Sequence, residues 1–175
     1  EYDLAHIDAI VGHFTMHQAS VCEGLAGWIE AKDPFIFSIV RNPIDRVESL
    51  YSFREKWTTH PQRGANRYET ADTFAGRIPT DIQCQWLKYR RRGDGHVYAG
   101  RADLKPVVYA TEQIGKELTE ELMKRNIIER DPAEEEKDYT RSGRLEISAL
   151  SQETRLKYEA GEDMMLYRQL LGMNV

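Results

Sequence analysis

The stretch FIFSIVRNP constrains the fold of this chain more than any other part of its sequence. Residues 35–40 are almost all apolar, β-branched or aromatic, which is typical of a short strand covered on both faces, as in a parallel sheet. Asn42 is a favourable N-cap, and Pro43 is a favourable first helical residue. We therefore expect the strand to pass directly into a helix that runs to about Trp57, with Arg41 at the turn.

The rest of the sequence alternates between short apolar runs and segments with helical periodicity. These patterns predict strands at 6–11 and 107–110, helices at 17–31, 71–91, 112–125 and 151–171, a turn at 93–96, and loops at 58–70 and 129–138. Thr111 and Ser151 are expected to cap the last two helices, and Pro79 is a candidate break within the helix at 71–91. The alternation favours one α/β domain over residues 1–175, with a mostly parallel sheet flanked by helices.

Composition, charge and hydropathy argue against a general nucleic-acid binder and against a membrane-spanning protein. The chain has 41% hydrophobic and 30% charged residues, which is ordinary for a globular domain. Its net charge of −5 argues against a general nucleic-acid binder, although a small basic pocket can exist in an acidic protein. No run of about 18 apolar residues occurs, so we expect neither a transmembrane helix nor membrane contact.

The two cysteines, Cys22 and Cys84, are consistent with one disulfide or with two reduced thiols, and the burial statistics of cysteine favour thiols. Their spacing matches no metal-binding motif, so no metal is expected. Because the chain begins with Glu1 rather than Met, we expect further residues upstream, with any targeting or anchor segment among them. The lack of a cysteine framework favours a bacterial-type cytoplasmic protein, with a Golgi luminal domain as the alternative.

The carboxyl end of the strand at 35–40 has the features of a phosphate site. Ligands of open α/β sheets bind outside the carboxyl ends of strands, and the free N–H groups and dipole of a helix N-terminus favour an anion. The guanidinium of Arg41 matches phosphate oxygens, and Ser49 lies seven residues after Asn42, on the same helical face. The alternative is an ordinary strand–loop–helix unit in which Arg41 pairs with a surface carboxylate.

The run Arg-Asn-Pro-x-x-Arg-x-x-Ser-x-Tyr from Arg41 to Tyr51 resembles the second cofactor motif of sulfotransferases. The resemblance is closest to the Golgi carbohydrate type and its bacterial relatives, including the uronyl 2-O-sulfotransferases. In that family the matching Arg and Ser hold the 3′-phosphate of 3′-phosphoadenosine 5′-phosphosulfate, so the resemblance assigns this role to Arg41 and Ser49. It implies a layout related to P-loop kinases, sulfuryl transfer to a hydroxyl of a carbohydrate or similar acceptor, and adenosine 3′,5′-bisphosphate as product.

Three weaker matches to segments of this family occur along the chain in the same order as in the family. Residues 11–15, Val-Gly-His-Phe-Thr, resemble the Gly-His segment in which 2-O-sulfotransferases place a catalytic histidine. This makes His13 the candidate general base, with a structural or exposed loop histidine as the alternative. Residues 108–113 resemble a strand followed by an acidic helix start, and residues 150–167 resemble the closing helix.

The first cofactor motif of the family does not occur in these 175 residues. It is a strand followed by a Pro-Lys-x-Gly-[ST]-[ST] loop that holds the 5′-phosphosulfate, and relatives carry it upstream of the Gly-His segment. We therefore expect it before Glu1 and interpret the chain as the C-terminal part of such a domain. The alternative is a non-catalytic nucleotide-binding domain that keeps only the 3′-phosphate pocket. A P-loop kinase-like phosphotransferase would need Gly-x-x-x-x-Gly-Lys-[Ser/Thr], which is also absent.

The basic run at 88–92, a late loop and the three tryptophans are further candidates for a role in binding. The basic run at 88–92 is typical of a solvated helix end, and recognition of an anionic polysaccharide is the alternative. A late loop often covers the 3′-phosphate in sulfotransferases, which makes candidates of Arg141, Ser142 and Arg144. Core or substrate-cleft positions are expected for Trp28, Trp57 and Trp86.

Overall fold

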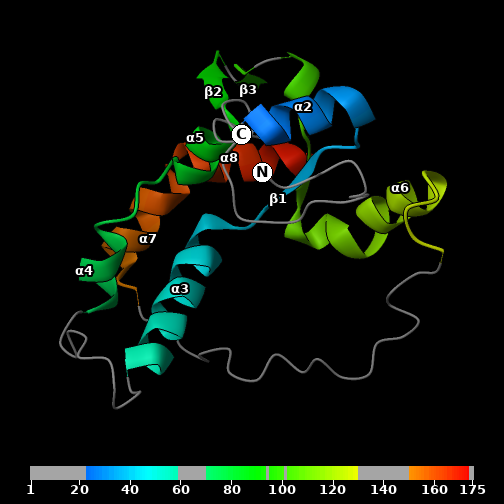
Figure 1. Ribbon diagram of the computed structural model, residues 1–175. Helices are drawn as coiled ribbons and strands as arrows, with labels where there is room; N and C mark the ends of the chain where they lie inside the picture. Colours follow the sequence, from blue (N-terminus) through cyan, green and yellow to red (C-terminus); the bar gives the residue numbers. More distant parts are fainter. Residues whose placement is uncertain (1–22, 59–69, 94, 101, 130–149, 174–175) are drawn as a thin grey trace.

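The computed structural model describes residues 23–58, 70–93, 95–100, 102–129 and 150–173. They form a mixed α/β fold with two small sheets and flanking helices (Figure 1). The helices are α2 Glu23–Lys32, α3 Pro43–Thr58, α4 Ala71–Ala75, α5 Ile82–Leu87, α6 Thr119–Lys124, α7 Gln152–Glu159 and α8 Glu162–Leu170. The strands are β1 Phe37–Val40, β2 Tyr89–Arg92, β3 Gly95–Tyr98 and β4 Val107–Ala110, and the short helical turns are η1 Ala102–Leu104, η2 Thr111–Gln113 and η3 Ile114–Leu118.

Strands β1 and β4 pair in parallel, with Phe37 opposite Val107 and Val40 opposite Ala110. The prediction that both segments belong to one parallel sheet, flanked by helices, is confirmed. Burial differs from the expectation: Val40 is fully buried, but Ile39 is 43% exposed, so β1 is covered at its carboxyl end rather than along both faces. The P-loop-kinase-like layout stays a prediction.

The helix predicted at 71–91 is wrong in its second half. It divides into α4 and α5, and α5 ends at Leu87, because the C-cap residue Lys88 has a left-handed φ of 59°. The following residues form β2, which pairs antiparallel with β3. Gly93, at φ +64°, lies between the two strands, but the turn predicted at 93–96 is too long, because Gly95 and His96 belong to β3. The basic run is therefore the edge of a hairpin instead of a helix end.

The predicted closing helix is two helices that meet at Gly161. A Cβ on Gly161 would lie 2.7 Å from Cβ of Thr80, so glycine lets α8 approach this segment closely. The N–H of Asp163 donates to the Thr80 carbonyl at 3.2 Å, which anchors the first turn of α8. The predicted cap at Ser151 is confirmed, because its hydroxyl accepts the Thr154 N–H at 3.3 Å.

The helix expected at 112–125 exists as the irregular series η2, η3 and α6. Thr111 does not cap it. Instead the Gln113 side chain folds back, and its Oε1 accepts the Ala110 N–H at 2.7 Å. The Gln113 amide also donates to the Leu170 carbonyl at 3.2 Å, so this turn is fastened to the end of α8.

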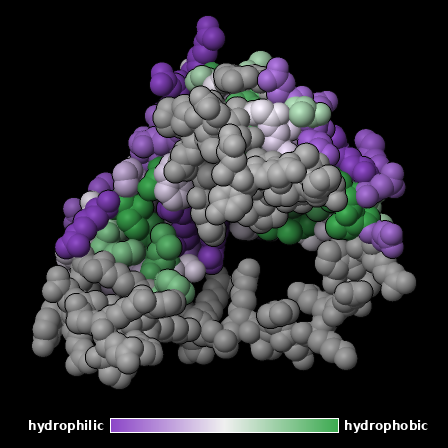
Figure 2. Space-filling model, in the orientation of Figure 1, coloured by the Kyte–Doolittle hydropathy of each residue, from purple (hydrophilic) through white to green (hydrophobic). Residues whose placement is uncertain are grey.

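The main core lies among α3, α4, α5, α7, α8 and the ends of β1 and β4. Tyr158 is at its centre and is 1% exposed, and its hydroxyl donates to the carbonyls of Ala75 and Ile78, each at 2.8 Å. Figure 2 shows hydrophilic side chains over the β2–β3 hairpin and apolar surface beside α4 and α7. None of the helices in the described part has the length and apolar character needed to cross a membrane.

Candidate functional site

The carboxyl edge of the β1–β4 sheet brings Arg41 and Glu112 to one place. Val40 and Ala110 are paired in the parallel register, so the segments after both strands leave the sheet at the same edge. Arg41 follows Val40 directly, and Glu112 lies in η2 after Ala110. We call this region, with Arg41, Asn42 and Glu112, the Arg41 edge.

The backbone of Arg41 is held on both sides by the side chain of Gln83 from α5. The Arg41 N–H donates to Gln83 Oε1, and Gln83 Nε2 donates to the Arg41 carbonyl, both at 3.0 Å. Gln83 is buried, and its own N–H donates to the carboxylate of Asp163 at 2.9 Å. Because these partners are themselves packed, the Arg41 side chain starts from a rigid base.

Asn42 caps α3 and uses its first N–H groups. Its Oδ1 accepts the N–H of Ile44 at 2.9 Å and that of Asp45 at 3.4 Å, and Pro43 has no N–H. The expectation that free N–H groups of this helix would hold an anion is therefore wrong. An anion here depends on side chains and on the dipole of the 16-residue α3.

Glu112 places a solvent-exposed carboxyl group at the Arg41 edge. Burial opposes its charge, yet its pKa lies below the ordinary value because the Tyr167 hydroxyl donates to it. The Thr111 hydroxyl, at 3.0 Å, and the positive charge of Arg41 act in the same direction. Burial and the bond to Glu112 raise the pKa of Tyr167, which therefore keeps the proton it donates. A phosphate that binds Arg41 has to compete with this carboxylate.

Ser49 lies on α3 with its side chain exposed to solvent. It is seven residues from Asn42, about 10 Å along the helix axis at 1.5 Å per residue. If Arg41 and Ser49 hold the same phosphate group, the Arg41 side chain therefore has to extend along the first two turns of α3.

The second arginine of the motif has a different environment. The Arg46 guanidinium lies 5.1 Å from the ring centroid of Trp86. Burial lowers the pKa of Arg46, and the charge of Asp163 partly offsets this effect. Trp86 is 45% exposed and forms the outer face of this contact, rather than core. Arg46 therefore joins α3 to α5 and α8.

Sequence reasoning missed three residues around Arg41: Gln83, Glu112 and Tyr167. Gln83 and Tyr167 come from α5 and α8, far from the motif along the chain. Their relevance depends on packing, which the motif does not encode. Glu112 carried a signal, because it follows a strand that was predicted to be parallel to the first.

Several predicted residues lie outside the described part of the chain. They are His13 with its Gly-His segment, the strand at 6–11, Cys22, Arg141, Ser142 and Arg144. The side chain of Trp57 is also outside it, whereas Trp28 is buried.

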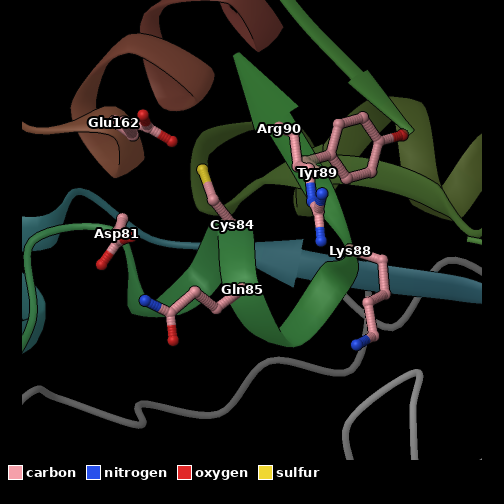
Figure 3. Close-up of a pocket in the computed structure, with 7 residues that line it drawn as sticks. All are labelled: Asp81, Cys84, Gln85, Lys88, Tyr89, Arg90 and Glu162. Carbon is pink, nitrogen blue, oxygen red and sulfur yellow. The ribbon is translucent and has the colours of Figure 1, made fainter. Parts of the chain in front are cut away.

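A cavity of about 430 Å³ opens beside α5 and the start of β2 (Figure 3). Its lining residues are Asp81, Cys84, Gln85, Lys88, Tyr89, Arg90 and Glu162. Figure 3 shows the two acids on one side and the two cations on the other. The basic run thus contributes to a cavity of mixed charge, and its recognition of an anionic polysaccharide stays a prediction.

The chain was compared with protein-family models, with curated proteins and with solved structures. None of these three comparisons gave a match.

Proposed function

We propose that this chain is a sulfotransferase-like domain that binds the 3′-phosphate of 3′-phosphoadenosine 5′-phosphosulfate at the Arg41 edge. The observation that carries the proposal is the position of Arg41 at the carboxyl edge of a parallel sheet, at the N-terminus of a 16-residue helix. The motif from Arg41 to Tyr51 gives the sequence support. Arg41 would supply the planar donors for the phosphate, and Ser49 would supply a hydroxyl donor.

The proposed reaction moves a sulfuryl group from the nucleotide to a hydroxyl of a carbohydrate or similar acceptor. The bond between sulfur and the 5′-phosphate oxygen breaks, the bond between sulfur and the acceptor oxygen forms, and the acceptor proton passes to a base. His13 is the proposed base, because of the Gly-His segment that carries it. The acceptor and the sulfated position are not assigned.

A second candidate function is nucleotide binding without transfer. It is favoured by the absence of a Pro-Lys-x-Gly-[ST]-[ST] segment from the 175 residues. Both functions need the same 3′-phosphate pocket, and they differ in whether a sulfuryl group moves. Transfer of isotopically labelled sulfate to an oligosaccharide therefore separates them, whereas nucleotide affinity does not.

The pocket is tested by Arg41→Ala in titrations with adenosine 3′,5′-bisphosphate and adenosine 5′-monophosphate. Loss of a charge-assisted hydrogen bond costs about 1.5–3 kcal/mol, so bisphosphate affinity should fall about 10- to 100-fold. Affinity for the monophosphate should change much less, and Ser49→Ala should act in the same direction but more weakly. Arg155→Ala, which removes an exposed arginine from α7, is the matched control. An equal loss for both nucleotides would refute the assignment.

The proposed role of His13 as general base is tested by His13→Ala in a protein that includes the expected upstream 5′-phosphosulfate loop and transfers sulfate. Turnover should fall by about 10²–10⁴-fold. Bisphosphate affinity should stay within a few fold, because a base does not touch the 3′-phosphate. Unchanged turnover, or loss of nucleotide affinity together with turnover, would make His13 a structural residue.

A further inference from the structure

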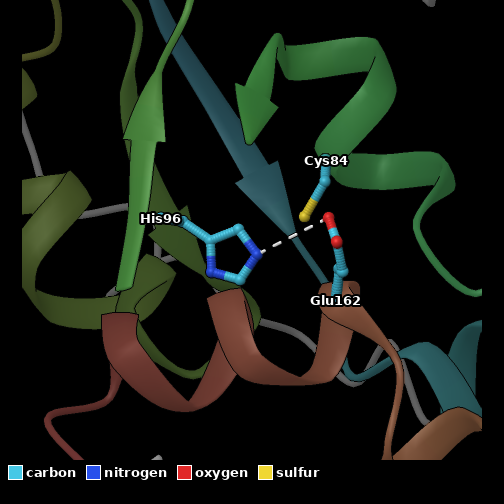
Figure 4. Close-up of side chains that lie close together, drawn as sticks. All are labelled: Cys84, His96 and Glu162. Atoms are coloured by element: carbon cyan, nitrogen blue, oxygen red, sulfur yellow. Dashed lines mark ion pairs between the residues drawn. The ribbon is translucent and has the colours of Figure 1, made fainter. Parts of the chain in front are cut away.

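Three potential metal ligands meet away from the Arg41 edge. Cys84 comes from α5, His96 from β3 and Glu162 from the first position of α8. One ligand atom of each lies within 4.8 Å of the other two. Figure 4 shows the three side chains pointing toward one another, with His96 Nε2 4.0 Å from a Glu162 oxygen. We call this group the Cys84 cluster.

The imidazole of His96 is the most informative member. Its side chain is only 1% exposed, and Nε2 has no hydrogen-bond partner among the described residues. At 4.0 Å, the Glu162 oxygen is too far away for a hydrogen bond. The backbone N–H of His96 is satisfied, since it donates to Gln169 Oε1 at 2.9 Å. This buried ring nitrogen, which faces a thiol and a carboxylate, is thus available to bind an external ligand.

The cluster has charges of both signs around it, with Lys88 and Arg90 in the cavity lining, Arg91 near His96, and carboxylates on the Cys84 side. Glu162 belongs to the cluster, the Asp163 carboxylate accepts the Cys84 N–H at 2.8 Å, and Asp81 lines the neighbouring cavity. These carboxylates disfavour another negative charge and attract a positive one. Asp163 is not counted as a ligand, because its oxygens accept the N–H groups of Gln83 and Cys84 and a hydrogen bond from the Cys84 thiol, which the thiol gives up when it binds an ion.

We propose that the Cys84 cluster binds a zinc-type divalent ion through the Cys84 sulfur, His96 Nε2 and the Glu162 carboxylate. Thiolate, imidazole and carboxylate are the three ligand types that proteins use for Zn²⁺. A tetrahedral ion with bonds of 2.0–2.3 Å holds its ligand atoms about 3.3–3.8 Å apart, so the cluster would contract by roughly 1 Å. The Cys84 thiol gives its proton to solvent as the ion binds.

The neighbouring cavity gives the ion an entry route and space for a fourth ligand. Cys84 and Glu162 both line it, and the Glu162 side chain is 43% exposed. A water molecule can take the fourth position, whereas Asp81 lines the same cavity but does not belong to the cluster. The bound ion would join α5, the β2–β3 hairpin and α8. This proposal replaces the expectation of no metal, which considered only cysteine spacing.

The test is a titration of the whole chain with Zn²⁺ in competition with a chromophoric chelator, together with Co²⁺ as a spectroscopic probe. One ion per chain should bind, and Co²⁺ should give a thiolate-to-metal charge-transfer band. Cys84→Ser should abolish this band, and Cys22→Ser, which alters the other cysteine, should keep it. Glu162→Gln, at a half-exposed position that tolerates an amide, should weaken Zn²⁺ binding at least about tenfold.

Three results would overturn the proposal. The first is the absence of stoichiometric Zn²⁺ binding to the folded chain. The second is a charge-transfer band that depends on Cys22 instead of Cys84. The third is unchanged affinity in Glu162→Gln relative to Glu120→Gln, an exposed control on α6. Adenosine 3′,5′-bisphosphate binding does not enter these readouts, so the proposed function and the metal site fail independently.

Discussion

The Arg41 edge and the Cys84 cluster differ in origin and in the state of their polar groups. Arg41 and Asn42 are adjacent in sequence, whereas Cys84, His96 and Glu162 come from three separate elements. At the Arg41 edge, Asn42 and Gln83 satisfy the backbone groups, and hydroxyls satisfy Glu112. In the Cys84 cluster a buried ring nitrogen has no partner among the described residues. A motif that is visible in the sequence can therefore have polar groups that are largely paired, while a buried unpaired group can depend on contacts that the sequence does not show.

One buried residue connects the two regions. Asp163 is 1% exposed, and its oxygens accept the N–H groups of Gln83 at 2.9 Å and Cys84 at 2.8 Å. Through Gln83 it supports the turn of Arg41, and through Cys84 it supports the cluster. The comparison can thus be tested by variants that affect both regions, one region or neither.

Asp163→Ala should have the largest effect. It leaves two buried N–H groups without an acceptor, which should lower the free energy of unfolding by about 3 kcal/mol. Asp163→Asn should cost less, because its amide oxygen can still accept one of the two N–H groups, although its NH2 group cannot accept the other. Urea unfolding measures both, with the exposed Lys157→Ala as control. A loss below about 1 kcal/mol for Asp163→Ala would show that the two regions are supported independently.

Gln83→Met should affect the Arg41 edge through its backbone. The variant fills similar space but leaves the N–H and carbonyl of Arg41 unpaired, so the free energy of unfolding should fall by about 1–3 kcal/mol. Bisphosphate affinity should also fall, by less than in Arg41→Ala, because the guanidinium remains. Full affinity in a folded Gln83→Met protein would mean that α5 does not position Arg41.

Glu112→Gln should strengthen nucleotide binding by a few fold. It removes a negative charge beside Arg41 that a phosphate has to overcome, and this gain should shrink as salt concentration rises. Titration with adenosine 3′,5′-bisphosphate at low and high salt measures it. Weaker binding in this variant would instead identify Glu112 as the residue that orients Arg41.

The smallest expected effect is that of Asp72→Asn on stability, because Asp72 belongs to neither site. Its carboxylate accepts the Ser151 N–H at 3.0 Å, and this bond holds its pKa below the ordinary value of 3.8. The unfolded chain therefore binds the proton more readily, so this stabilisation is present above about pH 4 and is lost as the pH falls through the lowered pKa. The melting temperature should fall less steeply between pH 5 and 3 in Asp72→Asn than in the unaltered chain. The difference should correspond to the binding of about one proton at most. Both ligand affinities should stay unchanged.

Local chemistry made much of the fold predictable. The strand at 107–110, the helix from Pro43 and the cap at Ser151 all follow from runs of a few residues. The errors come from distant contacts: Gly161 divides the last helix because α8 packs against Thr80. The run after Lys88 forms a strand because it pairs with β3.

The candidate sites show the same limit. The position of Arg41 was predictable, because a strand and a helix start fix it locally. The identity of Asn42 as N-cap also implies that its side chain engages the first N–H groups of α3, which leaves them unavailable to an anion. The Cys84 cluster spans residues 84 to 162, so only the tertiary fold defines it.

The most direct test of the central claim is the ratio of two dissociation constants for the unaltered chain. Adenosine 5′-monophosphate and adenosine 3′,5′-bisphosphate differ only in the 3′-phosphate, which the account assigns to Arg41 and Ser49. Calorimetric titration at one salt concentration should give tighter binding of the bisphosphate by about 10- to 100-fold, the value of a charge-assisted contact. Equal dissociation constants, or no binding of either nucleotide, would show that Arg41 and Ser49 do not hold a 3′-phosphate.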